Sequence, residues 1–427
     1  MKLKKILNRF LQLHPKEIDL SLDRINRLTN NLGNPQDKLN IISITGTNGK
    51  YSTAQAIKSI LEEANYKCDL YTSPHIQKIN ERFVFAGKEI NDERLSNLLE
   101  EVEQINNKNP ITFFEILTAA FFLEASRSGS DIAILESGLF HRFDACSNIK
   151  KNLISVLTSI HEDHLDWLPK NERSIDRIIF EKTSKLLDSK IVVAEQSSQQ
   201  IMNKIENAIK ENLSDKIFFK KDFNYSLNEN NFFYYEDRYG GLKLPCPNLL
   251  GNFQISNIST AIASLRKLEQ FKISDDNIKK GIVKIKSIAR LQELEQGKLK
   301  KISKNNTLMV DGSHNPLGAS VIKKYLETFN KLKKIHIIIG MMNNKDHKNF
   351  ISYFKNIAHS ITTVDIPNQK NAIKKEKLMM IVKNQGIEAN AAKSIKQAVK
   401  SISKKEKNSL ILFTGSLYLA GEVLNLN

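Results

Sequence analysis

The chain has 427 residues, more than one hydrophobic core usually holds, so its length predicts two domains. Hydrophobic residues make up 41% and charged residues 26% of the sequence, a balance that excludes a disordered protein. The 64 Lys and Arg outnumber the 47 Asp and Glu, which gives a formal net charge of +17. The lysines are scattered and are not interleaved with aromatic residues as in single-strand binders, so we expect no nucleic-acid partner.

Three cysteines, Cys68, Cys146 and Cys246, are odd in number and lack the spacing of a metal site. Such thiols are typical of a reducing compartment. The start MKLKKILNRF is basic and then apolar like a signal peptide, but Asn8 and Arg9 interrupt its apolar run and no small-residue cleavage site follows. No apolar stretch reaches the length of a membrane span. We therefore expect a cytoplasmic protein with no membrane partner, and we expect a monomer.

Apolar runs rich in β-branched residues recur along the first half of the chain, and segments with helical periodicity lie between them. The runs cover residues 39–45, 68–72, 131–137, 152–160 and 190–195. The helical segments include 113–127 and 171–187. Continuous apolar strands that alternate with helices predict a doubly wound, mostly parallel sheet that is covered on both faces. The predicted fold class is therefore α/β.

The pattern changes at residues 216–245, where aromatic and polar residues alternate around turn-forming Asn and Gly. This change predicts a small antiparallel insertion, followed by a helix over 254–269. A second series of apolar runs then covers 306–312, 334–340, 360–366 and 409–415. We expect these runs to form a smaller, Rossmann-like α/β domain. The polar stretch 295–306 is the expected linker, which puts the two domains at 1–295 and 296–427.

The sequence ISITGTNGKYST, residues 42–53, places a glycine-bearing loop between the first strand and a helix. This is the context of a phosphate-binding loop, in which the backbone N–H groups from Gly46 to Lys50 curl around phosphate oxygens. Lys50 adds a positive charge, and the helix that starts near Tyr51 adds the positive end of its dipole. A plain strand-to-helix turn would also favour Gly and Asn, but it does not explain a lysine where the helix begins. The segment predicts a nucleotide site.

Further motifs surround this loop, and their order carries a resemblance. Before the loop stand IDLSLDRI (18–25) and LGNPQ (32–36). After it come YTSPH (71–75), NER (80–82), TFFEILTAAFF (112–122), DHLDWL (163–168), FEKTS (180–184), GNFQISN (251–257), ARLQ (289–292), DGSHNP (311–316) and TGSLYLAGE (414–422). With these motifs in this order, the chain resembles the folylpolyglutamate synthase/dihydrofolate synthase family, a branch of the Mur-ligase superfamily, over essentially its whole length.

The resemblance implies an ADP-forming, ATP-dependent ligase of folate biosynthesis. ATP would activate a carboxyl group of dihydropteroate, or the γ-carboxyl group of a reduced folate, as an acyl phosphate that the amine of L-glutamate attacks. The segment IDLSLDRI is similar to the bifunctional bacterial type, which favours both reactions. Magnesium at two sites would neutralise phosphate charge during the transfer. Residues 1–295 would form the ATP-binding, Mur-ligase-type domain and residues 296–427 the glutamate-ligase domain.

The resemblance also implies site residues, position by position. ATP contacts are implied at Gly46, Thr47, Asn48, Gly49, Lys50, Tyr51, Ser52, Asn257, Arg290, Asp311 and His314. Magnesium ligands are implied at Ser52, Ser73, Glu136 and His164. Contacts to the pterin or folate are implied at Asp19, Leu20, Phe114, Glu115, Phe143, Asp144 and Ala145. The implied catalytic residues are Lys50, His164 and Lys182, and Lys182 aligns with the lysine that the family carries as a CO2-derived carbamate.

The chain departs from the family pattern in its two glycine-rich loops. Tyr51 stands where the family loop GTNGKGS has a glycine, which leaves Ser52 as the first hydroxyl group that can reach a metal ion. In ESGLFHRFDACSN (136–148), Phe140 and His141 replace two glycines of the family sequence EVGLGGRLDATN. These residues disfavour positive φ and fill space near the pterin, so we expect either a different loop path or a reshaped pocket.

Two further departures lie on the adenine side, and two alternative functions stay open. Phe253 replaces the histidine of the GxHQ motif, and SIARLQ lacks the Trp, Pro and Gly that usually precede Arg290. A Mur-type ligase that adds an amino acid to a UDP-linked sugar would share the phosphate loop, but TSPH, NER and TFFE argue against it, as does the lack of a UDP-binding domain before residue 39. A non-catalytic relative that binds nucleotide or folate is the other alternative.

Overall fold

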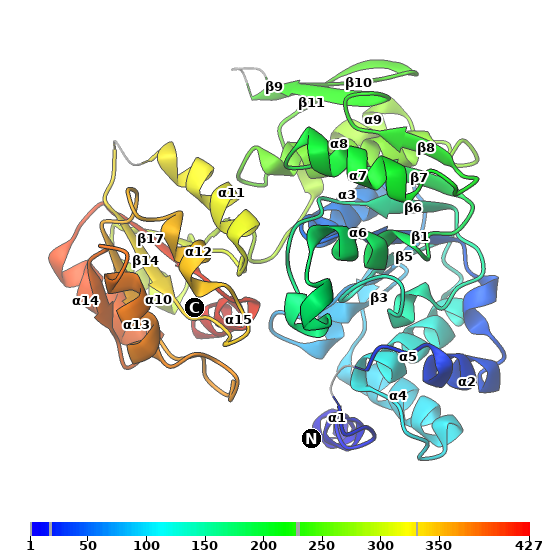
Figure 1. The fold of residues 1–427 in the computed structure, drawn as a ribbon, viewed down its shortest axis with the longest axis horizontal. Coiled ribbons are helices and arrows are strands. Elements are labelled where there is room, and N and C mark those ends of the chain that lie inside the picture. Colours follow the sequence, from blue (N-terminus) through cyan, green and yellow to red (C-terminus); the bar gives the residue numbers. More distant parts are fainter. Residues whose placement is uncertain (1, 17–18, 228–230, 330–331) are drawn as a thin grey trace. The chain divides into compact units, whose positions relative to one another are not determined.

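The computed structural model describes residues 2–16, 19–227, 231–329 and 332–427 (Figure 1). It divides into two compact units, one of residues 1–248 and 255–285 and the other of residues 249–254 and 286–427. The predicted domain boundary lies at residue 295. Ile18 of the motif at 18–25 and residues 228–230 of the predicted insertion lie outside the described residues.

The first unit is built on an eight-stranded sheet. Its order is β4 (Lys88–Glu89), β3 (Phe83–Phe85), β2 (Cys68–Tyr71), β5 (Ile132–Glu136), β1 (Ile41–Thr45), β6 (Ile154–Leu157), β7 (Lys190–Val193) and β8 (Asp215–Phe218). The six neighbouring strands β2, β5, β1, β6, β7 and β8 pair in parallel. Strand β3 pairs antiparallel with both β2 and β4. Every residue of the central strands β1, β5 and β6 is buried, as expected where helices cover both faces. The predicted doubly wound, mostly parallel sheet is confirmed.

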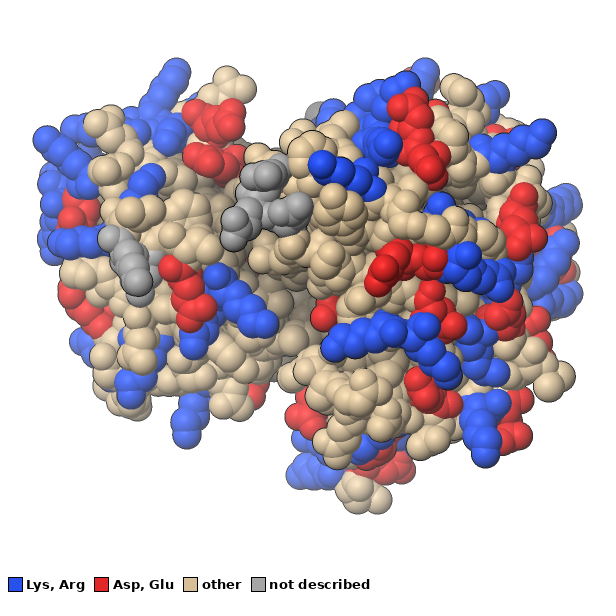
Figure 2. Space-filling model, turned by 90° about the horizontal axis from the view of Figure 1, so that it is seen from above, with Lys and Arg blue, Asp and Glu red and all other residues tan. Residues whose placement is uncertain are grey.

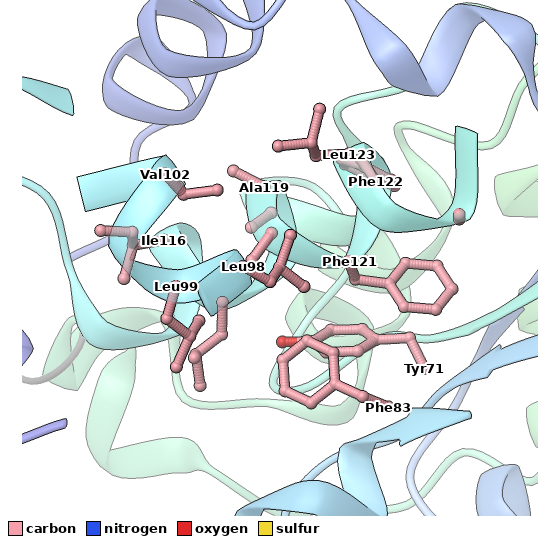
Figure 3. Close-up of a cluster of buried hydrophobic side chains, with 14 of the residues drawn as sticks. Tyr71, Phe83, Leu98, Leu99, Val102, Ile116, Ala119, Phe121, Phe122 and Leu123 are labelled. Carbon is pink, nitrogen blue, oxygen red and sulfur yellow. The ribbon is translucent and has the colours of Figure 1, made fainter. Parts of the chain in front are cut away.

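Helices α4 (Asp92–Asn106) and α5 (Phe113–Ser128) cover one face of this sheet. Ile41, Tyr71 and Leu135 share a buried cluster with side chains of both helices. Figure 3 shows the rings of Tyr71, Phe83 and Phe121 gathered beside leucines of α4. Because successive strand residues point to opposite faces, the alternate residues of these strands face α3 (Lys50–Glu63), which contacts β1, β2 and β5.

Two of the remaining helices of this unit correspond to the helices predicted over 171–187 and 254–269. The remaining helices are α1 (Lys2–Phe10), α2 (Asp23–Asn31), α6 (Ile175–Thr183), α7 (Gln199–Ala208), α8 (Phe253–Arg266), whose first two residues fall in the other unit, and α9 (Asp275–Lys284). The predicted helix over 171–187 is confirmed only in part, as α6. Ser174 ends it on the N-terminal side, because its side chain accepts a hydrogen bond from the N–H of Arg177 and caps the helix.

The predicted antiparallel insertion is a three-stranded sheet of β9 (Phe223–Leu227), β10 (Phe232–Asp237) and β11 (Gly240–Pro245). Its predicted start at residue 216 is wrong, because β8 is the last parallel strand of the large sheet. In that pairing Phe218 lies beside Val193 of β7. The long-range pairing with β7, which local alternation does not show, decides the role of this strand.

The second unit contains a six-stranded sheet in the order β12 (Gln292–Glu293), β13 (Thr307–Val310), β17 (Leu410–Thr414), β14 (Ile335–Ile339), β15 (Ser360–Thr363) and β16 (Ala389–Ala391). All its pairs are parallel except the short pair of β12 with β13. The helices of this unit are α10 (Lys298–Ser303), α11 (Pro316–Glu327), α12 (His347–Ser352), α13 (Lys375–Lys383), α14 (Ile395–Lys405) and α15 (Leu417–Leu426). The expected linker at 295–306 is therefore wrong: it includes α10, which buries Leu299.

Charged side chains of both signs are mixed over the face drawn in Figure 2, where Lys and Arg lie among Asp and Glu. This distribution agrees with a lysine-rich composition spread over a solvated surface. Among the described residues, no helix combines the length and the apolar character that crossing a bilayer would need.

Helix α9 packs on α3 at a close approach that only glycine allows. A Cβ atom on Gly281 would lie 2.6 Å from the Cα atom of Ile60, and the Gly281 carbonyl accepts a hydrogen bond from Ser59 Oγ at 2.8 Å. Since the obstructing atoms are backbone, the helices must separate to accept a methyl group. This contact therefore holds the helix that begins at the predicted phosphate loop.

We predict that Gly281→Ala lowers the free energy of unfolding by about 1–3 kcal/mol, because overpacking outweighs the gain of about 1 kcal/mol in helix propensity. Urea denaturation followed by circular dichroism measures the change. Gly241→Ala is the control, since its nearest heavy atom would lie 3.8 Å from the new Cβ. A Gly281→Ala protein as stable as the wild type would contradict the close packing.

Candidate active site

The predicted phosphate loop joins β1 to α3, and its two glycines occupy positions that other residues cannot fill. Gly46 has a φ of 143°, and a Cβ there would lie 2.0 Å from Thr158 Oγ1. Gly49 has a φ of 91°, and a Cβ there would lie 2.4 Å from Asn257 Oδ1 of α8. The loop is thus pressed between the segment after β6 and α8. Asn257, which the sequence placed on the ATP side, does lie against it.

Two backbone N–H groups of the loop, which we expected to bind phosphate oxygens, donate to a carbonyl group of the protein instead. The N–H groups of Thr47 and Asn48 donate to the carbonyl oxygen of Ser159, at 2.8 and 3.2 Å. The hydroxyl of Thr47 accepts a hydrogen bond from the His161 N–H at 3.1 Å. These two N–H groups therefore hold the loop against the end of β6. The N–H groups of the first turn of α3 have no carbonyl groups before them within the helix, so they can donate hydrogen bonds to an anion.

Two lysine side chains converge on one carbonyl group of this loop. The Gly46 oxygen accepts hydrogen bonds from Lys50 Nζ at 3.1 Å and from Lys182 Nζ at 2.8 Å. Lys182, on α6, also donates to the Leu139 carbonyl at 3.1 Å. Burial, and then the nearby positive charge of Lys50, lower the pKa of Lys182 to about 7. A large fraction of the Lys182 amine is thus uncharged at neutral pH.

Two predicted magnesium ligands lie together at the carboxyl ends of neighbouring parallel strands. Glu136 is the last residue of β5, and Ser73 follows β2. The Ser73 N–H donates to Glu136 Oε2 at 3.3 Å, while the Ser73 Oγ atom is buried without a hydrogen-bond partner among the described residues. A buried hydroxyl left beside a carboxylate fits a hard cation such as Mg²⁺.

The described residues form no group of three His, Cys, Asp or Glu side chains that could by itself hold a metal ion. A magnesium ion bound with a nucleotide usually takes one or two carboxylates and completes its shell with phosphate oxygens and water. Ser52, another predicted ligand, is buried in the first turn of α3. His164 has a φ of 59°, and its ring centroid lies 6.5 Å from that of Phe140.

Two residues that are predicted to contact the pterin and one that is predicted to bind magnesium lie close to Gly138. A Cβ on Gly138 would lie 3.2 Å from Phe114 Cζ, 3.3 Å from Asp144 Oδ2 and 3.4 Å from Ser73 Oγ. Asp144 is buried, and its carboxylate accepts the N–H groups of Gly138 and Leu139 at 2.8 and 3.2 Å. Burial raises the pKa of Asp144 even though these N–H groups favour its charged form. Asp144 therefore organises the loop after β5.

Other predicted pterin residues lie around this point in different environments. Ala145 is buried, and Phe143 and Leu20 are half-buried. The guanidinium of Arg142 lies 4.6 Å from the ring centroid of Phe143. Asp19 and Glu115 both pair with Arg24, a residue to which the sequence assigned no role.

Phe140 and His141, which depart from the family loop, pack into the interior of the protein. Phe140 and His141 are buried, and neither is among the described non-glycine residues with positive φ, so the loop follows a path that needs no glycine there. Ser137 Oγ and His141 Nδ1 are 3.1 Å apart, within hydrogen-bond distance. Burial lowers the pKa of His141 to about 4. The ring centroid of Phe140 lies 5.7 Å from Lys182 Nζ, so the Phe140 ring also covers the buried lysine.

In the second unit, Arg290, Asp311 and His314 gather around Gly312. Asp311 follows β13 and accepts the N–H groups of Leu291 at 2.9 Å and of Ser313 at 2.8 Å. A Cβ on Gly312 would lie 3.0 Å from Arg290 Nη1, and the Gly312 carbonyl oxygen lies 3.0 Å from His314 Nδ1.

The backbone around Arg290 carries strain. Ala289 and Leu291 have φ values of 52° and 49°, a conformation that non-glycine residues rarely adopt. Strain of this kind persists where surrounding contacts impose it, and it concentrates at functional positions. This feature agrees with the expected importance of Arg290, and no sequence signal foretold it.

Lys182 generates a pH-dependent prediction for the ligand-free protein in CO2-free buffer. The pKa of its amine is about 7 in the folded chain, against an ordinary value of 10.5. Between these values the unfolded chain keeps a proton that the folded chain loses, so the free energy of unfolding rises with pH by up to about 1.4 kcal/mol per pH unit. Below the folded pKa both states are protonated, and burial is then a constant destabilisation.

We predict that Lys182→Met removes this slope in urea titrations from about pH 6 to about pH 9. Lys185→Met, an exposed neighbour on the same segment, is the matched control. Equal slopes in the wild type and in Lys182→Met would contradict the depressed pKa.

Comparison with known proteins places these features in a family. Residues 44–265 match the family model described as the Mur ligase middle domain, and residues 297–417 match the Mur ligase glutamate ligase domain. The chain is 27% identical over 421 residues to a dihydrofolate synthase/folylpolyglutamate synthase of Bacillus subtilis, covering 94% of each chain. Escherichia coli FolC, solved in complex with DHPP and ADP, has a TM-score of 0.87 and 25% identity, covering 99% of this chain and 97% of that chain.

A third match shares the fold over the same extent. The bifunctional enzyme of Yersinia pestis, complexed with AMPPNP and a Mn ion, has a TM-score of 0.87 and 22% identity over 99% of this chain and 97% of that chain. The relatives confirm the predicted enzyme class, an ATP-dependent ligase, and the predicted resemblance to folylpolyglutamate and dihydrofolate synthases. Because the middle-domain match alone spans more than half of its residues, the chain belongs to the Mur ligase family.

Proposed function

We propose that this chain uses ATP to add L-glutamate to dihydropteroate and to the γ-carboxyl group of reduced folates. The observation that carries the proposal is the convergence of Lys50 and Lys182 on the Gly46 carbonyl, at the start of a helix. The strand before this loop pairs in parallel with β5, which ends at Glu136, and Glu136 accepts the Ser73 N–H. The Lys50 cation and a helix N-terminus suit a polyphosphate, and the buried Ser73 hydroxyl beside the Glu136 carboxylate suits its counter-ion.

The chemistry requires that a carboxylate becomes an electrophile. A substrate carboxylate oxygen attacks the γ-phosphorus of ATP, the bond to the β-phosphate oxygen breaks, and ADP leaves. The glutamate amine then attacks the acyl phosphate carbon, an amide bond forms, and inorganic phosphate departs with loss of a proton from the amine. The protein contributes mainly position and charge to such transfers, because little covalent chemistry falls to its side chains.

Lys50 is the residue best placed to stabilise the charge on the transferring phosphoryl group. Its ammonium folds back over the loop to the carbonyls of Gly46 and Thr47, at 3.1 and 3.2 Å. A bound triphosphate would offer stronger, charged acceptors in place of these neutral carbonyls. The helix N-terminus would present its N–H groups to the same phosphates, with Tyr51 filling the family's glycine position and Ser52 supplying the first hydroxyl.

Ser52, Ser73, Glu136 and His164 would hold magnesium at two sites. When bound, the ions would neutralise negative charge as it develops during phosphoryl transfer. Gly138 keeps open the narrow space between Phe114, Asp144 and Ser73, where the pterin side and the metal side meet.

Lys182 would carry a carbamate. An uncharged amine attacks CO2, forming an N–C bond and releasing a proton, and the product is a carboxylate on the lysine nitrogen. The lowered pKa of Lys182 supplies the uncharged amine, and the neighbouring Lys50 cation would stabilise the resulting anion. Modification would exchange the present hydrogen bonds to Gly46 and Leu139 for charged contacts near the phosphates.

We also propose Asn257, Arg290, Asp311 and His314 as residues that contact ATP, as the family resemblance implies. We also propose a cytoplasmic monomer. Free Cys68, Cys146 and Cys246 suit a reducing compartment.

We predict that the purified protein releases ADP when ATP, Mg²⁺ and L-glutamate are combined with dihydropteroate or tetrahydrofolate. Lys50→Ala should lower kcat by a factor of about 10²–10³, because a preorganised charge at the transferring group is lost. Lys58→Ala is the control, since Lys58 lies farther along α3 and pairs with Glu62 at 2.7 Å. Turnover with a UDP-linked sugar peptide precursor and none with either pterin would overturn the assignment in favour of the other ligase type.

The carbamate gives a separate prediction. Lys182→Ala should lose activity, and acetate or propionate should partly restore it by supplying the missing carboxylate. Lys185→Ala should keep wild-type turnover. An unmodified Lys182 amine in a crystal grown with bicarbonate, ATP and Mg²⁺ would refute the carbamate and leave the ligase assignment intact.

A further inference from the structure

We propose that Arg24 is a positioning residue for the pterin substrate. Its guanidinium links Asp19 to Glu115 and thereby fixes the positions of these two residues on the dihydropteroate side. This inference rests on the proposed function. It concerns a side chain on α2 to which neither the sequence motifs nor the comparisons give a role.

The guanidinium of Arg24 is the centre of a four-bond cluster. Its Nη1 and Nη2 atoms donate to the side chain and to the carbonyl oxygen of Asp19, at 2.8 and 2.7 Å. Its Nε and Nη2 atoms donate to the two carboxylate oxygens of Glu115, both at 3.0 Å. One planar group therefore joins Asp19 to Glu115, which lies 91 residues after Arg24 in the chain.

Burial makes this cluster more than a surface ion pair. The Arg24 side chain is 14% exposed and that of Glu115 is 5% exposed. Exposed pairs contribute little, but a buried, bidentate pair is specific in geometry and costly to break on one side. A lysine could keep the charge, yet it cannot reproduce the fork that meets Glu115 and Asp19 together.

Glu115 also fixes the start of α5. Its carboxylate also accepts the Thr112 N–H at 2.8 Å, while the Thr112 hydroxyl accepts the Glu115 N–H at 3.3 Å. This reciprocal capping box fixes the first turn of the helix. Phe114 stands in that turn, and its ring reaches the position of Gly138, beside Asp144 and Ser73. The path from Arg24 to the pterin side thus runs through contacts at every step.

The cluster also changes the roles expected of its members. Both oxygens of Glu115 are engaged by Arg24 and by Thr112, so Glu115 supports the first turn of α5. Asp19 is more exposed, at 28%, and is held additionally by Lys16 at 2.9 Å. Arg24 fixes both the backbone and the side chain of Asp19, next to Leu20. Loss of the fork would loosen the pterin side without touching the phosphate loop.

The test measures KM for dihydropteroate, KM for ATP, kcat and the melting temperature of Arg24→Lys. We expect KM for dihydropteroate to rise about tenfold or more, as loss of a charge-assisted, bidentate interaction implies. KM for ATP should stay within about twofold, because the loop contacts that hold the phosphates are made elsewhere. The expected pattern is a selective effect on dihydropteroate, with a fall of only a few degrees in melting temperature, because lysine keeps the positive charge beside Glu115.

Arg27→Lys is the matched control. Arg27 lies one turn along the same helix and donates to the Pro110 carbonyl at 2.9 Å, without touching Asp19 or Glu115. It should leave all four quantities near the wild-type values. In a double-mutant cycle, Arg24→Lys combined with Glu115→Gln should raise KM for dihydropteroate no further than the worse single variant, because both remove the same link.

Two outcomes would overturn the inference. If Arg24→Lys keeps the wild-type KM for dihydropteroate, the link does not shape the site. If it lowers the melting temperature and impairs ATP and dihydropteroate kinetics alike, its role is only structural. Failure of the proposed function is distinct, because the wild-type protein itself would then show no dihydropteroate-dependent ADP release.

Discussion

The carbonyl group of Gly46 is the point on which the first unit's site depends. It accepts hydrogen bonds from the amines of Lys50 and Lys182, which come from helices on two different parts of the chain. This convergence requires the loop to lie against Thr158, and only a glycine fits there. The large sheet makes the arrangement possible, because parallel pairing of β1 with β5 and β6 brings the ends of these strands to one edge.

Burial of a lysine at this edge couples stability to chemistry. Lys182 is held by carbonyl oxygens and covered by Phe140, in a site where a positive charge is poorly solvated. A core built for stability alone would place an apolar side chain here. The amine that is kept instead is partly uncharged near neutral pH, which is the form that reacts with CO2. In the proposed function, this cost in stability provides the amine that the carbamate requires.

The loop after β5 shows how a sequence can depart from its family and keep a closed, satisfied structure. Phe140 and His141 fill space that glycines would leave open, and His141 finds a hydrogen-bond partner in Ser137, itself a departure from the family valine. The two changes support each other, since a buried imidazole without a partner would be costly. Asp144 keeps its contacts with the loop N–H groups. The surroundings have changed while the organising carboxylate is retained.

Local pattern determined much of this protein: the α/β class, the long apolar strands of both sheets, and a glycine-bearing loop with a lysine between β1 and α3. These features depend on periodicity and on glycine and lysine at fixed spacing, which neighbouring residues alone create. The sequence pattern does not predict the edge strands β12 and β16, because they are short and lack apolar runs. Only the tertiary structure decided that β8 joins the large sheet, that Ser159 holds the N–H groups of Thr47 and Asn48, and that Arg24 links Asp19 to Glu115. Each of these contacts joins residues brought together by strand order and helix packing, and spacing along the chain carries no signal for them.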